Sequence, residues 1–252
     1  MDFQTFMQQF VNALSLGSLY ALIAIGYTMV YGILRLINFA HGDVFMIGGY
    51  LAFYAVTTFM MPWWIAVIVA IGLTTIFGMG LERVAYRPLR DSPRISIMIS
   101  AIGASFLIEN LAIVLFDARP KAFPVPDFFA STFVLGDVHV STVSVVIPIV
   151  TAIILGLLLW VVYRTKTGMA MRAVSTDIDA ARLMAIDVNR IVAFTFAVGS
   201  ALAAIGGIMW ALKYPRLEPL MGILPGLKCL IAAVVGGIGS ISGAVLGGLL
   251  LG

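Results

Sequence analysis

The sequence predicts an all-α membrane protein, a polytopic bundle of about seven or eight spanning or partly spanning helices. Of its 252 residues, 62% are hydrophobic and 11% are charged, so the chain has more apolar surface than one globular core could cover. No charged residue occurs between Asp2 and Arg35, or between Asp43 and Glu82, and each run exceeds the ~20 residues that a spanning helix needs. Because apolar residues are continuous and do not alternate with polar ones, these runs indicate helices rather than the strands of a membrane barrel.

The charges and the single cysteine exclude several classes of site. The net charge is +3, but most lysines and arginines gather in two short loops, which is a topology signal rather than a nucleic-acid-binding surface. Cys229 lies among apolar residues and has no second cysteine to pair with, so neither an internal disulfide nor a metal site is expected. We therefore expect one transmembrane domain over residues 1–252, in a lipid membrane, with no nucleic-acid partner, metal or cofactor.

Six apolar segments are expected to be separate spans. A turn at Pro62, with Trp63 and Trp64 at the membrane interface, divides the second segment from the third. The expected spans cover residues 10–34, 44–59, 63–81, 95–116, 142–163 and 191–212. A connection over residues 213–228, broken by proline and glycine, then leads to a last apolar run over residues 229–252.

Glycines are concentrated in this last apolar run. Gly239, Gly243 and Gly247 recur every four residues, a spacing that brings two helices into backbone contact, so we expect them to form a packing face. The runs GDVFMIGGYLAFY and GLKCLIAAVVGGIGSISGAVLGG each follow a break and enter a glycine-rich segment, which is weak evidence for an inverted repeat.

The distribution of lysines and arginines predicts the orientation. One side carries nine of them and the other carries five. The nine are Arg83, Arg87, Arg90, Arg94, Arg164, Lys166, Arg172, Arg182 and Arg190, and the five are Arg119, Lys121, Lys213, Arg216 and Lys228. The richer side is expected to be cytoplasmic, which places residues 164–190 inside the cell and the N-terminus outside. A re-entrant segment near residues 36–50 would change which side of the membrane the first spans and their lysines and arginines are assigned to.

The segment over residues 164–190 is the longest polar interruption of the chain, and it contains end signals of a helix from Asp177 to Ile186. Thr176, with Asp179 three residues later, forms a variant of the capping box. Asp177 and Asp179 also place negative charge at the positive end of this helix, which stabilises it.

One face of the predicted helix carries small side chains. Ile178, Ala181 and Ala185 fall on one side, so this face could dock against a partner surface. The alternative is a solvated loop helix without a partner.

A polar break, INFAHGD, separates the first two spans and supplies Asn38, His41, Gly42 and Asp43. If this break lies at membrane depth, its free backbone groups must face protein or a water-filled path. Broken helices of that kind are a recurring way to bind the carboxylate and ammonium groups of an amino acid. An ordinary cytoplasmic turn is the alternative.

Glu109 and Asn110 lie inside the span over residues 95–116. An ionised side chain at the centre of a spanning helix costs roughly 2.5 to 3.5 kcal/mol, so Glu109 is expected to face the bundle interior or water. Contact with a substrate and a purely structural hydrogen bond both remain open. No acid or base lies at helical spacing from Glu109, which argues against a proton relay.

Catalysis by this chain is not expected. The sequence contains no phosphate-binding loop of the pattern G-x-x-x-x-G-K-[ST], so any ATP must be hydrolysed by another chain. No nucleophile triad or carboxylate pair is apparent, and the two histidines are expected on opposite sides of the membrane.

Several separated motifs resemble one family. The runs DAARLMAID, INFAHGD, GSLYALIAIGYTMVYG and GLKCLIAAVVGGIGSISGAVLGG are similar to the permease subunit of bacterial branched-chain amino-acid ABC importers, over nearly the whole chain. The resemblance implies an inner-membrane location and transport of leucine, isoleucine and valine. It also implies a second permease subunit, identical or related, two ATPase subunits and an external substrate-binding protein.

The resemblance also assigns roles to residues. An acidic-Ala-Ala signature, matched here by Asp179, Ala180 and Ala181, sits in a groove of the ATPase in importers of this kind. The residues expected in this coupling segment, 164–190, are Asp177, Asp179, Ala180, Ala181, Arg182 and Ala185. Family members usually have glycine where this chain has Ala185, which predicts a less sharp turn after the helix.

The NFAHG match favours a functional role for the break without assigning a contact. Family members also continue through at least one further span, so a C-terminal truncation is expected. Two other functions stay open. An ion-coupled secondary transporter would need ion ligands, for which Glu109 is the one candidate, and a membrane scaffold would transport nothing.

Overall fold

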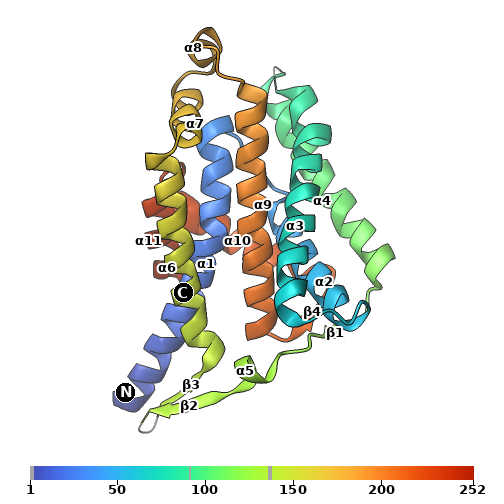
Figure 1. Cartoon of the computed structure of the whole chain (residues 1–252), viewed down its shortest axis with the longest axis vertical. Helices are drawn as coiled ribbons and strands as arrows, with labels where there is room; N and C mark the ends of the chain where they lie inside the picture. Colours follow the sequence, from blue (N-terminus) through green and yellow to red (C-terminus); the bar gives the residue numbers. More distant parts are fainter. Residues whose placement is uncertain (1–2, 91, 136–137) are drawn as a thin grey trace.

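Five long helices lie roughly along one axis in the computed structural model, which describes residues 3–90, 92–135 and 138–252 (Figure 1). They are α1 (Phe3–Leu34), α3 (Trp63–Leu81), α4 (Arg94–Phe116), α6 (Thr142–Arg164) and α9 (Val188–Lys213). By length and composition, each of the five is able to cross a membrane. The prediction of a polytopic helical bundle is therefore confirmed.

Three further apolar helices are shorter because the chain breaks inside the bundle. They are α2 (His41–Thr57), α10 (Ile223–Val235) and α11 (Ile241–Leu251). The last apolar run, residues 229–252, is divided between two helices, because a tight turn separates α10 from α11. Gly237 and Gly239 have φ angles of 93° and 96° in this turn, a conformation that favours glycine. The predicted connection over residues 213–228 is also shorter in the structure, since α10 begins at Ile223.

The two ends of the bundle differ in structure. One end carries α7 (Lys166–Thr176) and α8 (Ile178–Leu183), and the N-terminus lies at the other (Figure 1). Short elements cover the N-terminal end: β1 (Lys121–Ala122), α5 (Asp127–Ala130), β2 (Thr132–Leu135), β3 (Val138–Ser141) and β4 (Arg216–Leu217). Both strand pairs are antiparallel, with β1 beside β4 and β2 beside β3.

The two arginine-rich loops lie at the same end of the bundle, as the predicted orientation requires. The first contains a π-helix, η1 (Glu82–Tyr86), and a 3₁₀-helix, η2 (Arg87–Leu89). Arg90, directly after η2, donates a 2.7 Å hydrogen bond from Nη1 to Oδ1 of Asn189, at the start of α9. Lys228, counted as a loop residue of the opposite side, lies instead inside α10.

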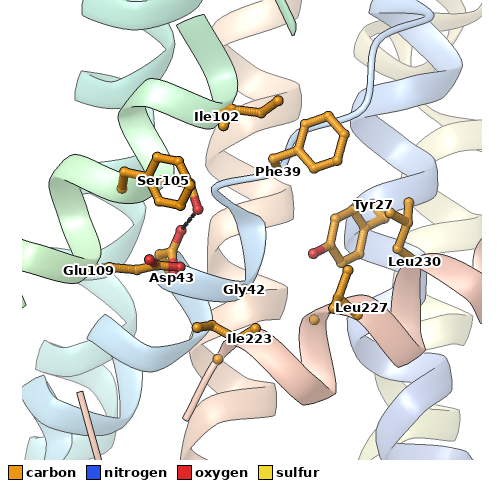
Figure 2. A pocket seen from close by; sticks show the side chains of 13 residues that line it. Tyr27, Phe39, Gly42, Asp43, Ile102, Ser105, Glu109, Ile223, Leu227 and Leu230 are labelled. Carbon is orange, nitrogen blue, oxygen red and sulfur yellow. Dashed lines mark hydrogen bonds between the residues drawn. The ribbon is translucent and has the colours of Figure 1, made fainter. Parts of the chain in front are cut away.

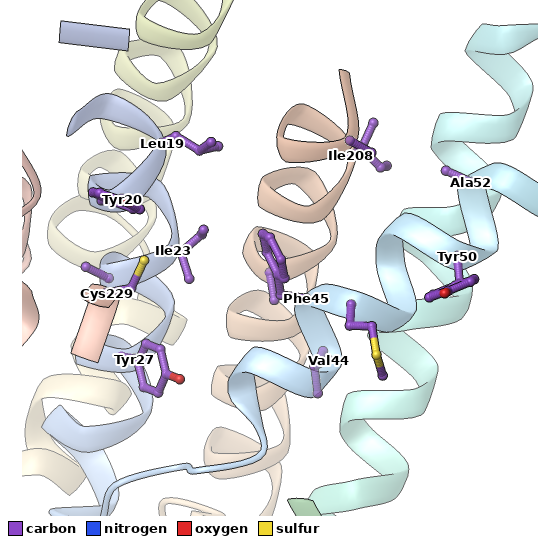
Figure 3. Close-up of a cluster of buried hydrophobic side chains, with 14 of the residues drawn as sticks. Leu19, Tyr20, Ile23, Tyr27, Val44, Phe45, Tyr50, Ala52, Ile208 and Cys229 are labelled. Atoms are coloured by element: carbon purple, nitrogen blue, oxygen red, sulfur yellow. The ribbon is translucent and has the colours of Figure 1, made fainter. Parts of the chain in front are cut away.

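Helices α1 and α9 form the centre of the bundle. In the most apolar stretch of α1 83% of residues are buried, against 17% in α4, so α4 is peripheral. The central cluster joins α1, α2 and α9 through large side chains such as Leu19, Phe45 and Ile208 (Figure 3). Gly207 allows α9 to approach α2, because a Cβ there would lie 2.2 Å from the carbonyl oxygen of Phe45.

The first turns of α2 and α10 meet inside the bundle. A Cβ added to Gly42 would lie 2.6 Å from the carbonyl oxygen of Gly222, so both backbones need glycine at this contact. From there α2 runs towards the end that carries β1, whereas α10 runs to the turn at Gly239, beside Arg172. An inverted repeat requires two broken helices of opposite direction, and that interpretation stays a prediction.

Candidate functional site

The polar break before α2 lies inside the bundle. Asn38, His41 and Asp43 are each at most 4% exposed. Ser105, in the middle of α4, donates a 2.5 Å hydrogen bond to Oδ2 of Asp43, which places this carboxylate at the depth of the helix centre. An exposed cytoplasmic turn therefore does not describe the break.

A cavity of about 180 Å³ lies beside this break, between α1, α2, α4 and α10 (Figure 2). Its polar groups come from Tyr27, Asp43, Ser105 and Glu109, and the first turn of α10 forms part of its wall. Figure 2 shows the carboxyl groups of Asp43 and Glu109 next to each other. The apolar lining includes Phe39, Ile102, Phe106, Ile223, Leu227 and Leu230.

This lining suits a small zwitterion with an apolar side chain. Two adjacent carboxylates attract a cation such as an ammonium group, because the surrounding apolar wall weakens screening by water. The N-terminal end of a helix carries a partial positive charge, and α10 starts at the same cavity. The aliphatic and aromatic wall offers contacts to an apolar side chain.

Not all residues of the predicted substrate path reach this cavity. Gly42, Asp43 and Glu109 line it together. His41 turns towards α1, where its ring lies 4.4 Å from that of Tyr27, and its Nε2 has no hydrogen-bond partner among the described residues. Asn38 is also outside the cavity, since its Oδ1 accepts a 2.6 Å hydrogen bond from the Tyr86 hydroxyl.

Asn110 faces away from the cavity. Its side chain is exposed on α4 and donates a 2.7 Å hydrogen bond to the carbonyl oxygen of Phe106, one turn earlier. Within α4, no acid or base lies at helical spacing from Glu109. Asp43 of α2, however, lies beside Glu109 in the cavity. Sequence reasoning missed Tyr27, because an aromatic residue in an apolar span gives no sign of the cavity it faces.

The predicted coupling helix is present as α8, but its cap is different. The side chain of Asp177 caps α8, accepting hydrogen bonds at Oδ1 from the backbone N–H groups of Asp179 and Ala180 at 2.9 and 3.0 Å. Thr176 instead ends α7 and donates its hydroxyl to the carbonyl oxygen of Arg172. The predicted capping box at Thr176 is therefore wrong.

The turn after α8 is sharper than predicted. Ala185 has a φ angle of 58°, in the left-handed region. The N–H of Ile186 bonds to the carbonyl of Ala181, and that of Ala185 to the carbonyl of Arg182, both at 3.1 Å. This pair of bonds is the Schellman ending, which normally uses glycine at the position that Ala185 occupies.

The predicted small-residue face of α8 is divided in the structure, since Ala181 is buried and Ala185 is exposed. Ala181 is 3% exposed and packs in the chain's own cluster with Met171 and Val174. The outward surface is formed by Leu183 and Met184, which are 88% and 77% exposed. Asp177, Asp179, Ala180, Arg182 and Ala185 are exposed as well.

The predicted glycine face packs within the chain. A Cβ on Gly243 would lie 1.9 Å from the carbonyl oxygen of Gly236, and one on Gly247 would lie 2.0 Å from that of Ala232. These two glycines therefore bring α11 against α10. Gly239 lies in the turn before α11, next to Gly32 of α1.

Residues 9–252 match the family described as branched-chain amino acid transport system / permease component. The chain is 44% identical to the high-affinity branched-chain amino acid transport system permease protein BraD of Pseudomonas aeruginosa, over 98% of this chain and 84% of that protein. It is 42% identical to LivH of Escherichia coli, a permease protein of the same description, over 100% of this chain and 85% of LivH. A probable LivH of Methanocaldococcus jannaschii is 28% identical over 96% of this chain and 77% of that protein.

No solved structure matches the chain. The family match covers all helices that surround the cavity, together with α8. Together with the five long apolar helices, these similarities place the chain, a multi-pass protein of the cell membrane, in the family of branched-chain amino acid transport permeases.

Proposed function

We propose that this chain is the translocation subunit of an ATP-driven importer for leucine, isoleucine and valine, and that the cavity between α2, α4 and α10 belongs to its substrate path. The observation that supports this path most directly is the pair of carboxyl groups, Asp43 and Glu109, at membrane depth. Ionisable residues inside a membrane are costly and usually serve a function.

The cavity chemistry fits a branched-chain amino acid. In this proposal Asp43 and Glu109 attract the α-ammonium group, and the first turn of α10 attracts the carboxylate. Leu227 and Leu230 of α10 contact the branched side chain. Several weak contacts suit transport better than one tight site, because a substrate must also leave.

ATP hydrolysis belongs to a separate ATPase, since the chain is a transport subunit and not an enzyme. We propose that the importer has two ATPase subunits and that one of them docks at α8 of this chain, within the coupling segment, residues 164–190. Leu183 and Met184 give this helix an apolar tip, and large exposed apolar side chains surrounded by polar ones are typical of interaction sites. The external substrate-binding protein would then dock at the opposite end, beside β2 and β3.

The outer face of α4 fits a second permease subunit. Asn110 exposes an amide there at membrane depth, and the 59% exposed Phe106 lies between the cavity and the outside. A polar side chain at this depth normally faces protein or water rather than lipid. We propose that a second permease, identical or related, covers this face and that residues 1–252 act as one transmembrane domain.

Asp43→Asn and Glu109→Gln test the substrate path, because each removes one charge with little change of shape. We expect each variant to lower leucine uptake by about ten-fold or more, the effect of about 1.4 kcal/mol, while the amount of assembled importer stays constant. The measurement is uptake of radiolabelled leucine by membrane vesicles that contain the complete importer.

Asp117→Asn is the matched control. Asp117 is exposed at the end of α4, and asparagine tolerates its φ angle of 67°. Wild-type uptake in both Asp43→Asn and Glu109→Gln, at equal amounts of importer, would remove the carboxylate pair from the path.

A further inference from the structure

The π-helix η1 follows α3 at the end that carries α8. A π-helical turn is rare and is frequently found at functional sites. Here it holds two buried polar side chains, Glu82 and Tyr86, which are 2% and 3% exposed. They contact different parts of the molecule.

Tyr86 connects η1 to the break before α2. Its hydroxyl donates to Oδ1 of Asn38 at 2.6 Å, and its ring lies 5.1 Å from that of Phe196 in α9. The carbonyl oxygen of Asn38 accepts the N–H of His41 at 3.1 Å, which begins α2. Gly42 and Asp43 of the cavity follow directly.

Glu82 connects η1 to the start of α9. Its Oε1 accepts a 2.6 Å bond from Nη2 of Arg90, and both side chains are at most 9% exposed. Arg90 also donates from Nη1 to Asn189, the second residue of α9. A four-residue turn, 184–187, separates α9 from α8.

We propose that η1 couples α8 to the substrate cavity, with Tyr86 as the positioning residue for the first turn of α2. This inference rests on the proposed function. When an ATPase shifts α8, the start of α9 moves with it and displaces η1 through Asn189 and the buried pair of Arg90 and Glu82. Tyr86 then carries Asn38, and with it Asp43, to a new position.

Tyr86→Phe tests this role because it removes one hydroxyl and keeps the ring against Phe196. In proteoliposomes with the complete importer, we expect the number of leucine molecules transported per ATP hydrolysed to fall by about five-fold or more. We expect the ATPase rate to stay close to the wild-type value, since docking at α8 is intact. Tyr163→Phe, at an exposed tyrosine of α6, is the matched control and should leave the ratio unchanged.

Asn38→Ala is a second test, because it removes the acceptor of the Tyr86 hydrogen bond. If the hydrogen bond carries the coupling, Asn38→Ala should lower the ratio as Tyr86→Phe does, and the double variant should lower it no further. An unchanged ratio in Tyr86→Phe would overturn the proposal, as would an equal loss of uptake and ATP hydrolysis, which indicates a structural role alone. A wild-type importer without ATP-driven leucine uptake would refute the proposed function instead.

Discussion

Gly42 shows how a single residue shapes the cavity. Its contact with the carbonyl oxygen of Gly222 joins two backbones, so no rotamer change can make room for a side chain. In the sequence, Gly42 in the polar break permits a close backbone approach, but its partner becomes visible only when α10 is placed against α2.

Gly42→Ala is expected to separate the first turns of α2 and α10. Overpacking of this kind costs about 1 to 3 kcal/mol, and the variant should unfold at lower temperature in detergent. Gly103→Ala on α4 is the control, because a Cβ there meets nothing within 4 Å. Equal unfolding temperatures for the two variants would contradict the close contact.

Ala185 is a second position where one residue controls the local backbone. Alanine in the left-handed region is strained by roughly 1 kcal/mol, which glycine relieves at the cost of greater freedom in the unfolded chain. We expect Ala185→Gly to slow hydrogen exchange of the Ile186 amide, whose bond to Ala181 closes the turn. The opposite change, faster exchange, is expected for Ala180→Gly, because glycine weakens a helix interior. Faster exchange in Ala185→Gly would show that the turn is unstrained.

At the scale of elements, α8 presents an apolar tip, Leu183 and Met184, next to the exposed Ala180 and Ala185. Leu183→Lys should lower co-purification of the ATPase about ten-fold while membrane insertion stays unchanged. Met169→Lys is the control, since Met169 is similarly exposed on α7 but lies outside α8. Unchanged co-purification in Leu183→Lys would place the docking surface elsewhere.

The elements that sequence reasoning predicted well are those defined by composition. The sequence predicts a span over residues 63–81, and α3 has the same bounds, because Pro62 and Glu82 flank an uncharged and mostly apolar run. The cap of α8 was misplaced because Thr176 and Asp177 are both competent caps, and the choice depends on α7, which uses Thr176 as its last residue.

The hairpin of α10 and α11 was missed because glycines at regular spacing predict close packing as well as a turn. Positive φ angles at Gly237 and Gly239 decide between the two, and these depend on tertiary contacts. The proximity of Asp43 and Glu109 was missed for the same reason, since it depends on tertiary contacts. Each residue was selected singly for its polarity in an apolar span, but only the fold brings α2 beside α4.

At the scale of the whole molecule, two polar regions are separated by apolar helices. One is the end that carries α8, and the other is the half-open cavity beside Asp43. The central helices α1 and α9 run between these two regions. The segment at η1 connects them through the buried hydrogen bond from Tyr86 to Asn38 and the exposed one from Arg90 to Asn189. This arrangement suits a subunit that receives force at one end and responds at membrane depth.

The central claim is that an ATPase drives transport through this chain. Its most direct test is leucine uptake by proteoliposomes that contain the chain with its second permease, two ATPase subunits and loaded binding protein, measured with ATP and with ion gradients separately. The account predicts uptake that requires ATP, persists when ion gradients are collapsed by ionophores, and falls in Asp43→Asn. Uptake that continues without ATP and follows an ion gradient would contradict it and favour a secondary transporter.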